Sequence, residues 1–108
     1  MPSYVPEEIS AAGVADVVRR FVEAAVVCKE VGFTGVQIHA AHGYLLSSFL
    51  NPLANRRADR YGGSTASRST LLLEVVQATR AAVGGSFPIS VKLNSSEFWL
   101  LCHGGFRK

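Results

Sequence analysis

Two histidines and a tyrosine, His39, His42 and Tyr44, lie close together at the end of an apolar stretch of the chain. That stretch contains the β-branched residues Val36 and Ile38 between glycines, which is typical of a short buried strand. In parallel α/β sheets and barrels, binding and catalytic side chains gather at the carboxyl ends of the strands. The sequence therefore predicts a strand that ends in a functional site.

A zinc site is one alternative for the His39-x-x-His42 pair, because imidazole is a common zinc ligand. Such sites need three or four ligands, and neither Cys28 nor Cys102 has a suitable spacing, while His103 lies in the C-terminal tail. The pattern therefore argues against zinc. From the residues alone, a plainer interpretation also stays open, in which His39 is a histidine with satisfied hydrogen bonds at the rim of a core.

An amphipathic helix is expected before this strand. Ser10 is expected to cap the helix, with Ile9 and Val14 forming a hydrophobic staple, and Gly32 provides the left-handed residue that ends it. The strand itself is expected over residues 34–39. The buried face of the helix consists of residues at helical spacing: Val14, Val17, Val18, Phe21, Ala25 and Cys28.

The second half of the chain again has the order helix and then strand. A short helical turn over residues 45–50 ends before Pro52, and a polar loop leads to Ser64. Ser64 is expected to cap a second amphipathic helix that stops at Gly84, and a second strand is expected over residues 89–93. Strands joined by a helix of this length pair in parallel, so their carboxyl ends face the same side.

The composition indicates one compact unit with a high apolar content. Of 108 residues, 48% are hydrophobic and the mean hydropathy is +0.22, which favours apolar faces that pack against neighbours. The net charge is +3, with 11 basic and 8 acidic residues. The basic residues are scattered apart from Arg56, Arg57 and Arg60, so the sequence does not predict a nucleic-acid surface. We interpret these three arginines as belonging to a solvated or carboxylate-paired loop.

Membrane insertion and export are not expected from this sequence. No stretch approaches the roughly 18 uncharged apolar residues of a membrane helix, and residues 1–8 lack the basic start and apolar run of a signal peptide. Cys28 and Cys102 form no Cys-x-x-Cys pair, so a reducing compartment is expected rather than a disulfide framework. We therefore expect a cytoplasmic protein.

A longer set of motifs begins at the two histidines: His39-Ala40-Ala41-His42-Gly43-Tyr44-Leu45-Leu46, Phe49-Leu50-Asn51-Pro52, Asn55-Arg56-Arg57-Ala58-Asp59 and Tyr61-Gly62-Gly63-Ser64. Together they resemble the signature of the Old Yellow Enzyme family of FMN-dependent NAD(P)H oxidoreductases, or ene reductases. The family fold is a (β/α)8 barrel, which needs roughly 250 residues. The resemblance implies an α/β fold here, a partial (β/α)8 TIM barrel of about two βα units with parallel strands. Residues 1–9 are then an irregular lead-in, residues 10–98 the barrel fragment, and residues 99–108 an anomalous tail.

The resemblance also implies the chemistry. NAD(P)H reduces FMN, and flavin N5 then delivers hydride to the β-carbon of an α,β-unsaturated carbonyl compound. His39 and His42 match the family's substrate-binding donors to the carbonyl oxygen, where charge develops. Tyr44 matches the catalytic general acid that protonates the α-carbon. Lys92 matches a cofactor-binding cation beside flavin N1 and O2, although many relatives have arginine there, with a planar fork that lysine lacks.

Without the family motif, two of these residues have plainer interpretations. Lys92 would be a surface lysine that extends its amino group into water, and Tyr44 would pack its ring under the following helix. Elsewhere the chain departs from the family pattern. Ala66-Ser67 replaces the usual Glu-Asn, and Arg60 stands where an acid is expected, so the loop is expected to be looser. The apolar segment Trp99–His103 interrupts the pattern near the C-terminus, which we interpret as a truncated gene product or a faulty gene model.

Two functions fit these residues. The first is an FMN-dependent NAD(P)H oxidoreductase that reduces activated C=C bonds of α,β-unsaturated carbonyl compounds. Its partner is a small enone-type molecule, and neither nucleic acid nor a membrane is expected. The alternative is a truncated, catalytically inactive fragment or association module of the same fold, which binds a second copy or another chain through exposed apolar faces.

A relative that reduces dienoyl thioesters competes with the first function within the same fold. It carries an iron–sulfur cluster, for which this chain lacks the set of cysteines. In such barrels the loops after strands 7 and 8 bind phosphate, and the sequence predicts only two strands. We therefore expect the chain alone to bind FMN weakly or not at all, and to show no turnover.

Overall fold

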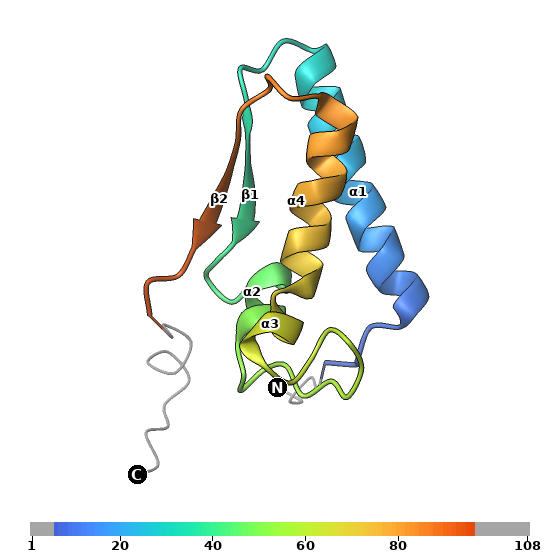
Figure 1. Ribbon diagram of the computed structural model, residues 1–108, viewed down its shortest axis with the longest axis vertical. Coiled ribbons are helices and arrows are strands. Elements are labelled where there is room, and N and C mark those ends of the chain that lie inside the picture. Colours follow the sequence, from blue (N-terminus) through green and yellow to red (C-terminus); the bar gives the residue numbers. More distant parts are fainter. Residues whose placement is uncertain (1–5, 97–108) are drawn as a thin grey trace, which may run out of the picture.

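The computed structural model describes residues 6–96, which form four helices and two strands (Figure 1). The predicted order of elements is confirmed. Predictions that concern residues 1–5, Glu97, Phe98 and the tail 99–108 lie outside the described residues. The elements are α1 (Ala11–Glu30), β1 (Val36–Ala40), α2 (Leu45–Leu50), α3 (Thr65–Arg68), α4 (Thr70–Val83) and β2 (Ile89–Leu93).

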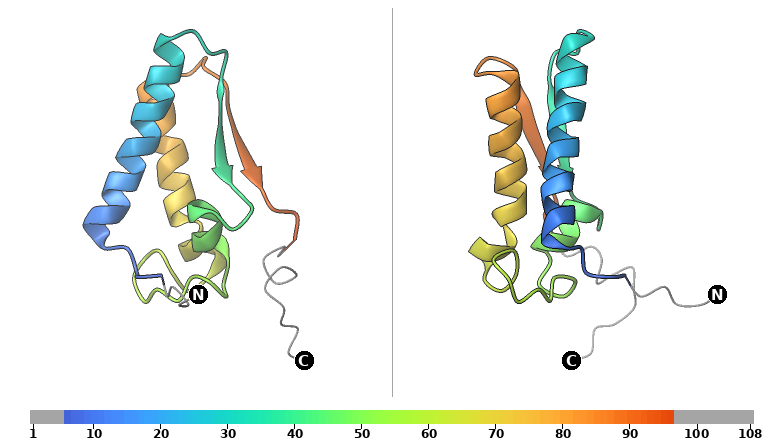
Figure 2. Two further views of the ribbon diagram at one scale, coloured as in Figure 1. Left: turned by 180° about the vertical axis from the view of Figure 1, so that it is seen from behind. Right: turned by 90° about the vertical axis from the view of Figure 1, so that its right-hand side faces the viewer.

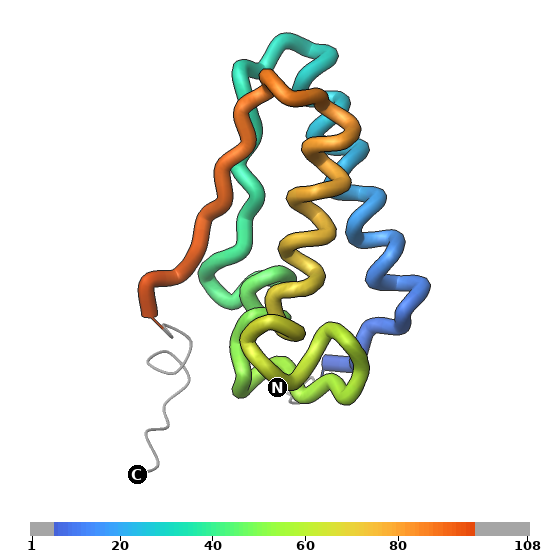
Figure 3. Tube along the Cα trace, viewed as in Figure 1, coloured from blue at the N-terminus to red at the C-terminus, as the bar shows by residue number. Residues whose placement is uncertain are grey.

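The two strands pair in parallel, as predicted, with Val36 opposite Ile89 and Ala40 opposite Leu93. Both carboxyl ends therefore lie at one edge of the sheet, where the trace also brings α2, α3 and the loop between them (Figure 3). The long helices α1 and α4 pack side by side and cover one face of the sheet (Figure 2). Ile38 is 4% exposed and belongs to the core between sheet and helices.

The first strand begins at Val36 and ends at Ala40, so the predicted span of residues 34–39 is wrong by two residues at its start and one at its end. The partner strand explains the start. The Val36 N–H donates to the carbonyl of Pro88, just before β2, at 3.0 Å. A Cβ on Gly35 would lie 2.9 Å from that carbonyl oxygen, so the close approach of the two chains also requires glycine there.

The ends of α1 agree with the sequence prediction. The Ser10 hydroxyl accepts a hydrogen bond from the Gly13 N–H at 3.1 Å, and Ile9 packs against the core cluster that contains Val14. Gly32 follows the helix with a φ of 98°, in the left-handed region that glycine adopts without strain. The amino group of Lys29 on α1 donates to the Val83 carbonyl at the C-terminal end of α4, at 2.6 Å. A side chain of one helix thus satisfies a free backbone carbonyl at the end of the other.

The predicted second helix is divided at Ser69 into α3 and α4, and the prediction of one continuous helix is wrong. Ser64 caps α3 as predicted, accepting from the Ser67 N–H. At the division, the Ser69 hydroxyl donates to the Thr65 carbonyl at 2.7 Å and the Thr70 hydroxyl donates to the Arg60 carbonyl at 3.2 Å. The bond from Ser69 to a carbonyl of α3 competes with the helical ladder and bends it, and the bond from Thr70 attaches the start of α4 to the loop.

The polar loop between α2 and α3 is built around Asn55, which is 9% exposed. Its side-chain NH2 donates to the carbonyls of Phe49 and Tyr61, each at 2.7 Å, and its oxygen accepts from the Arg57 N–H at 3.0 Å. One buried amide thus satisfies three backbone groups that have no hydrogen-bond partner within a helix or the sheet.

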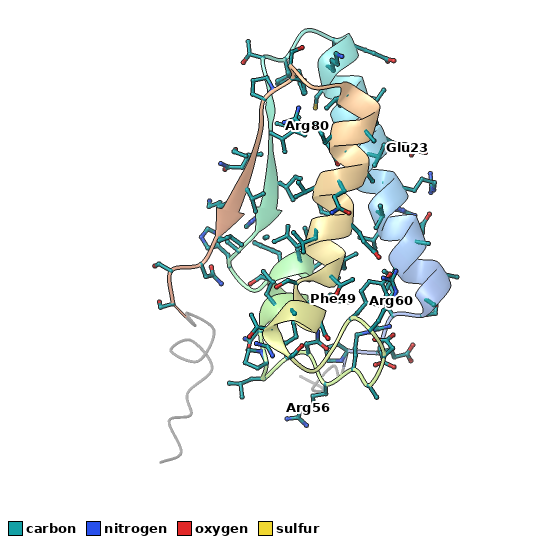
Figure 4. The ribbon with its side chains drawn as sticks, viewed as in Figure 1. Glu23, Phe49, Arg56, Arg60 and Arg80 are labelled. Atoms are coloured by element: carbon teal, nitrogen blue, oxygen red, sulfur yellow. The ribbon has the colours of Figure 1, made fainter. Side chains whose placement is uncertain are left out.

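Two of the three loop arginines pair with carboxylates, as expected for a carboxylate-paired loop. Arg57 forms two parallel bonds with Asp59, at 3.0 and 2.7 Å, and donates to the Ile9 carbonyl at 2.7 Å. Arg60 pairs with Glu74 on α4, so the arginine that replaces the family's acid has a partner of its own. Arg56 lies at the outer edge of the loop and points away from the helices (Figure 4).

Replacing Asn55 with alanine is expected to lower the free energy of unfolding by about 2–4 kcal/mol, because two buried carbonyls lose their donor. Asn55→Asp should cost a similar amount, since a carboxylate cannot donate. Urea unfolding followed by circular dichroism measures both. The exposed neighbour Arg56→Ala is the matched control and should change stability by less than about 0.5 kcal/mol. Equal midpoints for the Asn55 and Arg56 variants would contradict this role of Asn55.

The Arg57–Asp59 pair predicts how stability depends on pH. The Arg57 guanidinium holds the pKa of the Asp59 carboxyl below its ordinary value. The stabilisation is therefore fully present above the ordinary pKa of about 3.9 and is lost as the pH falls through the lowered pKa. We expect Asp59→Asn to be less stable than the wild type at pH 7, and the two unfolding curves to converge in acid. Denaturant titrations between pH 7 and pH 2 test this, and a difference that did not change with pH would refute it.

Candidate functional site

A tight turn follows β1 and carries the predicted site residues. His42 and Gly43 have φ values of 60° and 75°, and the Tyr44 N–H donates to the Ala41 carbonyl at 3.3 Å. Positive φ at both central residues is the pattern of a type I′ turn. Within residues 6–96, His42 is the one residue other than glycine with a positive φ. A left-handed backbone costs such a residue about 1–2 kcal/mol, so this turn is locally strained.

The turn brings the three predicted rings together. The His39 and His42 rings lie edge to face with centroids 5.3 Å apart, and the His39 and Tyr44 rings do so at 5.1 Å. His39 is therefore the central member of the group. A single oxygen atom can accept from both imidazoles at this separation, because each N–H···O bond spans about 2.9 Å. The turn thus places two imidazole rings and a phenol ring side by side.

The hydrogen bond of His39 within the turn favours one tautomer of its ring. The Ala41 N–H donates to Nδ1 of His39 at 3.3 Å. In a neutral ring the accepting nitrogen carries no proton, so the proton is on Nε2. In this neutral form the ring N–H of His39 takes no part in the turn.

Tyr44 occupies the N-cap position of α2 and makes no side-chain capping bond. The residue is 64% exposed, so the plainer interpretation, in which its ring packs under the following helix, is wrong. Its ring contacts His39 instead.

Lys92 lies beside His39, because the register of the parallel strands places these two residues opposite one another. Side chains alternate between the faces of a strand, and Ile38 and Ala40 face the helices. His39 and Lys92 therefore belong to the opposite face. That face also carries Gln37, whose NH2 donates to the Ser90 hydroxyl at 3.1 Å. Lys92 is the one Asp, Glu, Lys or Arg residue in the two strands, so its charge has no opposite charge on that face of the sheet.

Two residues that bind the turn were not predicted from the sequence. The Asn94 side chain accepts from the His42 N–H at 2.9 Å, and the Ser47 hydroxyl accepts from the Gly43 N–H at 3.2 Å. The place of Asn94, just past the end of β2, is the only sequence signal for it. Asn94 also lines a hollow of about 270 Å³ together with His42, Leu93, Ser95 and Ser96.

A larger hollow of about 670 Å³ lies between the chain before α1 and the loop after α2. It includes Gly43 and Leu45 but not His39 or Lys92, so we do not take this larger hollow as the candidate site.

Within the described residues, no group of three or more His, Cys, Asp or Glu side chains could hold a metal ion. None of the helices described between residues 6 and 96 is long and apolar enough to span a membrane.

Comparisons with known proteins agree on one family. The sequence profile described as "NADH:flavin oxidoreductase / NADH oxidase family" matches residues 1–102. The chain is 47% identical over 93 residues to a metal reductase of Desulforamulus reducens, covering 86% of this chain and 14% of the relative. It is 42% identical over 96 residues to an NADPH dehydrogenase of Bacillus subtilis, covering 89% of this chain and 28% of the relative.

The structure is similar to that of a morphinone reductase, with a TM-score of 0.78 and 34% identity, covering 86% of this chain and 25% of the other. The chain thus spans less than a third of the length of each of these proteins. The fold predicted from the sequence, a partial (β/α)8 barrel with two parallel strands, is confirmed. The chain therefore belongs to the NADH:flavin oxidoreductase / NADH oxidase family, which includes Old Yellow Enzyme.

Proposed function

We propose that this chain supplies the substrate-binding edge of an FMN-dependent NAD(P)H oxidoreductase that reduces the activated C=C bond of α,β-unsaturated carbonyl compounds. The observation that carries the proposal is the grouping of His39, His42 and Tyr44 at the carboxyl end of β1, beside Lys92 on β2. The two imidazoles, the tyrosine hydroxyl and the lysine cation at this end of the sheet suit a substrate with an electron-rich carbonyl oxygen conjugated to a C=C bond.

The two imidazoles would bind the carbonyl oxygen of the substrate. Negative charge develops on that oxygen when hydride adds to the conjugated bond, and fixed N–H donors stabilise it. His39 is suited to this because its Nδ1 accepts from the Ala41 N–H, so the Nε2–H of the neutral ring remains for the ligand. His42 adds a second donor from a ring at 5.3 Å. Each such donor typically contributes about 3–4 kcal/mol to the transition state.

Tyr44 would complete the reaction by protonating the α-carbon. Its side chain is exposed beside His39 and does not cap α2, so its hydroxyl is available to a bound ligand. General acids in such positions contribute roughly 10²–10⁴-fold to the rate.

The residues of the strands also fit the cofactor of the family. Bound FMN supplies the hydride from its N5 atom after reduction by NAD(P)H. Lys92 would hold the electron-rich edge of the flavin, since its amino group is exposed on a polar face and no carboxylate of the strands neutralises it. Lysine offers a point charge there, whereas arginine would offer two parallel donors.

A chimera provides the test. In it, residues 10–96 of this chain replace the matched segment of the Bacillus subtilis NADPH dehydrogenase, and NADPH oxidation is followed with cyclohex-2-enone. We expect His39→Leu to lower kcat/KM for the enone by about 10²–10³-fold, and Tyr44→Phe to lower kcat by about 10²-fold or more. Reduction of bound FMN by NADPH alone should stay within about twofold in both variants.

Tyr61→Phe is the matched control, because Tyr61 is a buried tyrosine of the loop whose hydroxyl donates to Glu74 on α4. It should leave the enone kinetics unchanged. A chimera in which Tyr44→Phe and Tyr61→Phe behaved alike, with no loss for His39→Leu, would refute the proposed roles.

Association with another chain is the second candidate, and exposed apolar side chains favour it. Val31, Phe33 and Leu93 are 67%, 62% and 58% exposed. Within the described residues, each strand also has one side whose backbone groups pair with no other strand. A second copy of the chain, or a chain that supplies further strands, would cover these surfaces.

Fluorescence titration with FMN and size-exclusion chromatography of the complete 108-residue chain test the two candidates together. We expect weak or no saturable quenching of flavin fluorescence, and an apparent mass that rises with protein concentration. Saturable micromolar binding that Lys92→Ala abolishes and Lys92→Arg retains would instead mean that the chain binds FMN by itself. A monomer at all concentrations would contradict association with a second copy.

A further inference from the structure

The strained turn after β1 is bound by side chains from two segments outside it, the helix α2 that follows and the chain just past β2. The Asn94 oxygen accepts from the His42 N–H at 2.9 Å, and the Ser47 hydroxyl accepts from the Gly43 N–H at 3.2 Å. These are the two residues of the turn with positive φ. Each left-handed residue therefore has its N–H bound by one side chain from outside the turn.

The two side chains are also joined to each other. The Asn94 NH2 donates to the Ser47 hydroxyl at 3.2 Å. We call this pair, with the two N–H groups that it binds, the Asn94–Ser47 clamp. It links the end of β2, the turn and α2, and Ser47 is 5% exposed within it. Because a reversed Asn94 amide would turn its NH2 towards the His42 N–H, the hydrogen bonds also fix the orientation of that amide.

The bonds within the turn itself are weaker supports for this conformation. The Tyr44 N–H to Ala41 bond and the Ala41 N–H to His39 bond are both 3.3 Å, at the long end of the range for such bonds. The bond from His42 to Asn94 is shorter. Since left-handed backbone in a residue other than glycine persists only where its surroundings hold it, Asn94 is the group best placed to hold His42.

We propose that Asn94 is a positioning residue, which keeps the backbone of His42 left-handed and so directs the His42 ring to His39. The geometry is independent of the reaction, whereas its consequence for substrate binding rests on the proposed function. Without the clamp, residue 42 relaxes to negative φ, the ring leaves its edge-to-face contact with His39, and the two donors no longer reach one oxygen.

The test uses NMR of the 108-residue chain and four substitutions, one of which is a control. Asn94→Leu removes both hydrogen bonds of the amide, and Ser47→Ala removes the acceptor for Gly43. Asn94→Asp keeps an acceptor for the His42 N–H and is the conservative rescue. Ser95→Ala, an exposed neighbour of Asn94, is the matched control.

The readouts are amide hydrogen exchange at His42 and Gly43, and the nuclear Overhauser contact between the two imidazole rings. Asn94→Leu should speed exchange at His42 about tenfold, the factor expected for one lost hydrogen bond. It should also speed exchange at Gly43, because the turn relaxes, and abolish the contact between the rings. Ser47→Ala should act mainly on Gly43. Asn94→Asp and Ser95→Ala should resemble the wild type. Unchanged exchange and an unchanged ring contact in Asn94→Leu would overturn the proposal.

A second background separates positioning from a general loss of stability. In His42→Gly the left-handed backbone carries no strain, so adding Asn94→Leu should leave the Gly43 amide protected, whereas Asn94→Leu alone exposes it. Equal loss of Gly43 protection in both backgrounds would show that Asn94 acts only as general structural support.

Titration of the wild-type chain with cyclohex-2-enone then distinguishes the two hypotheses. Enone-induced shifts of the His39 and His42 ring signals support the proposed function, and their absence counts against it. The clamp is judged without enone, from the exchange rates and the ring contact alone, so either hypothesis can fail while the other stands.

Discussion

The parallel pairing of β1 with β2 is the constraint on which the rest of this structure depends. Its register places His39 beside Lys92, on the face of the sheet opposite the helices. Side chains alternate along a strand, so a slip of one residue would turn Lys92 towards the core and bring an apolar side chain opposite His39. The same pairing ends both strands at one edge, which is why Asn94 can reach the backbone of His42.

The helices and the loop contribute in different ways to holding this edge. The helices α1 and α4 pack apolar side chains on one face of the sheet and leave the other face polar. The loop after α2 buries the ring of Tyr61 and otherwise depends on polar side chains, chiefly Asn55 and Arg57. Arg68 adds a bond from its Nε to the Leu50 carbonyl at 2.9 Å, which joins the end of α2 to α3. Hydrophobic packing thus supports the sheet, and directed hydrogen bonds shape the loop next to the site.

Most of the fold could be predicted because its signals are local. The caps at Ser10 and Ser64 and the stop at Gly84 depend on residues within one helical turn, and all three are confirmed. The division at Ser69 was missed because apolar spacing alone does not reveal side-chain bonds to helix carbonyls. The start of β1 was missed because it depends on Pro88, which is distant in the sequence.

For the site, the motif identified the ring-bearing residues, and the structure brings His39, His42 and Tyr44 together. Their roles stay predictions. The contribution of Asn94 could not be predicted, because a single asparagine after a strand has many uses and its contact with His42 spans 52 positions in the sequence.

The two paired strands lie far apart in the sequence, and this has a kinetic consequence. Gln37 and Ser90, which bond across the strands, are 53 positions apart, whereas most helical contacts join near neighbours. Non-local contacts form only after the entropy of closing a long loop has been overcome, so they set the folding rate. The helices can form early, but the site edge is complete only when β2 docks on β1. The arrangement of His39 beside Lys92 is therefore gained in the slowest folding step and lost in the first unfolding event that separates the strands.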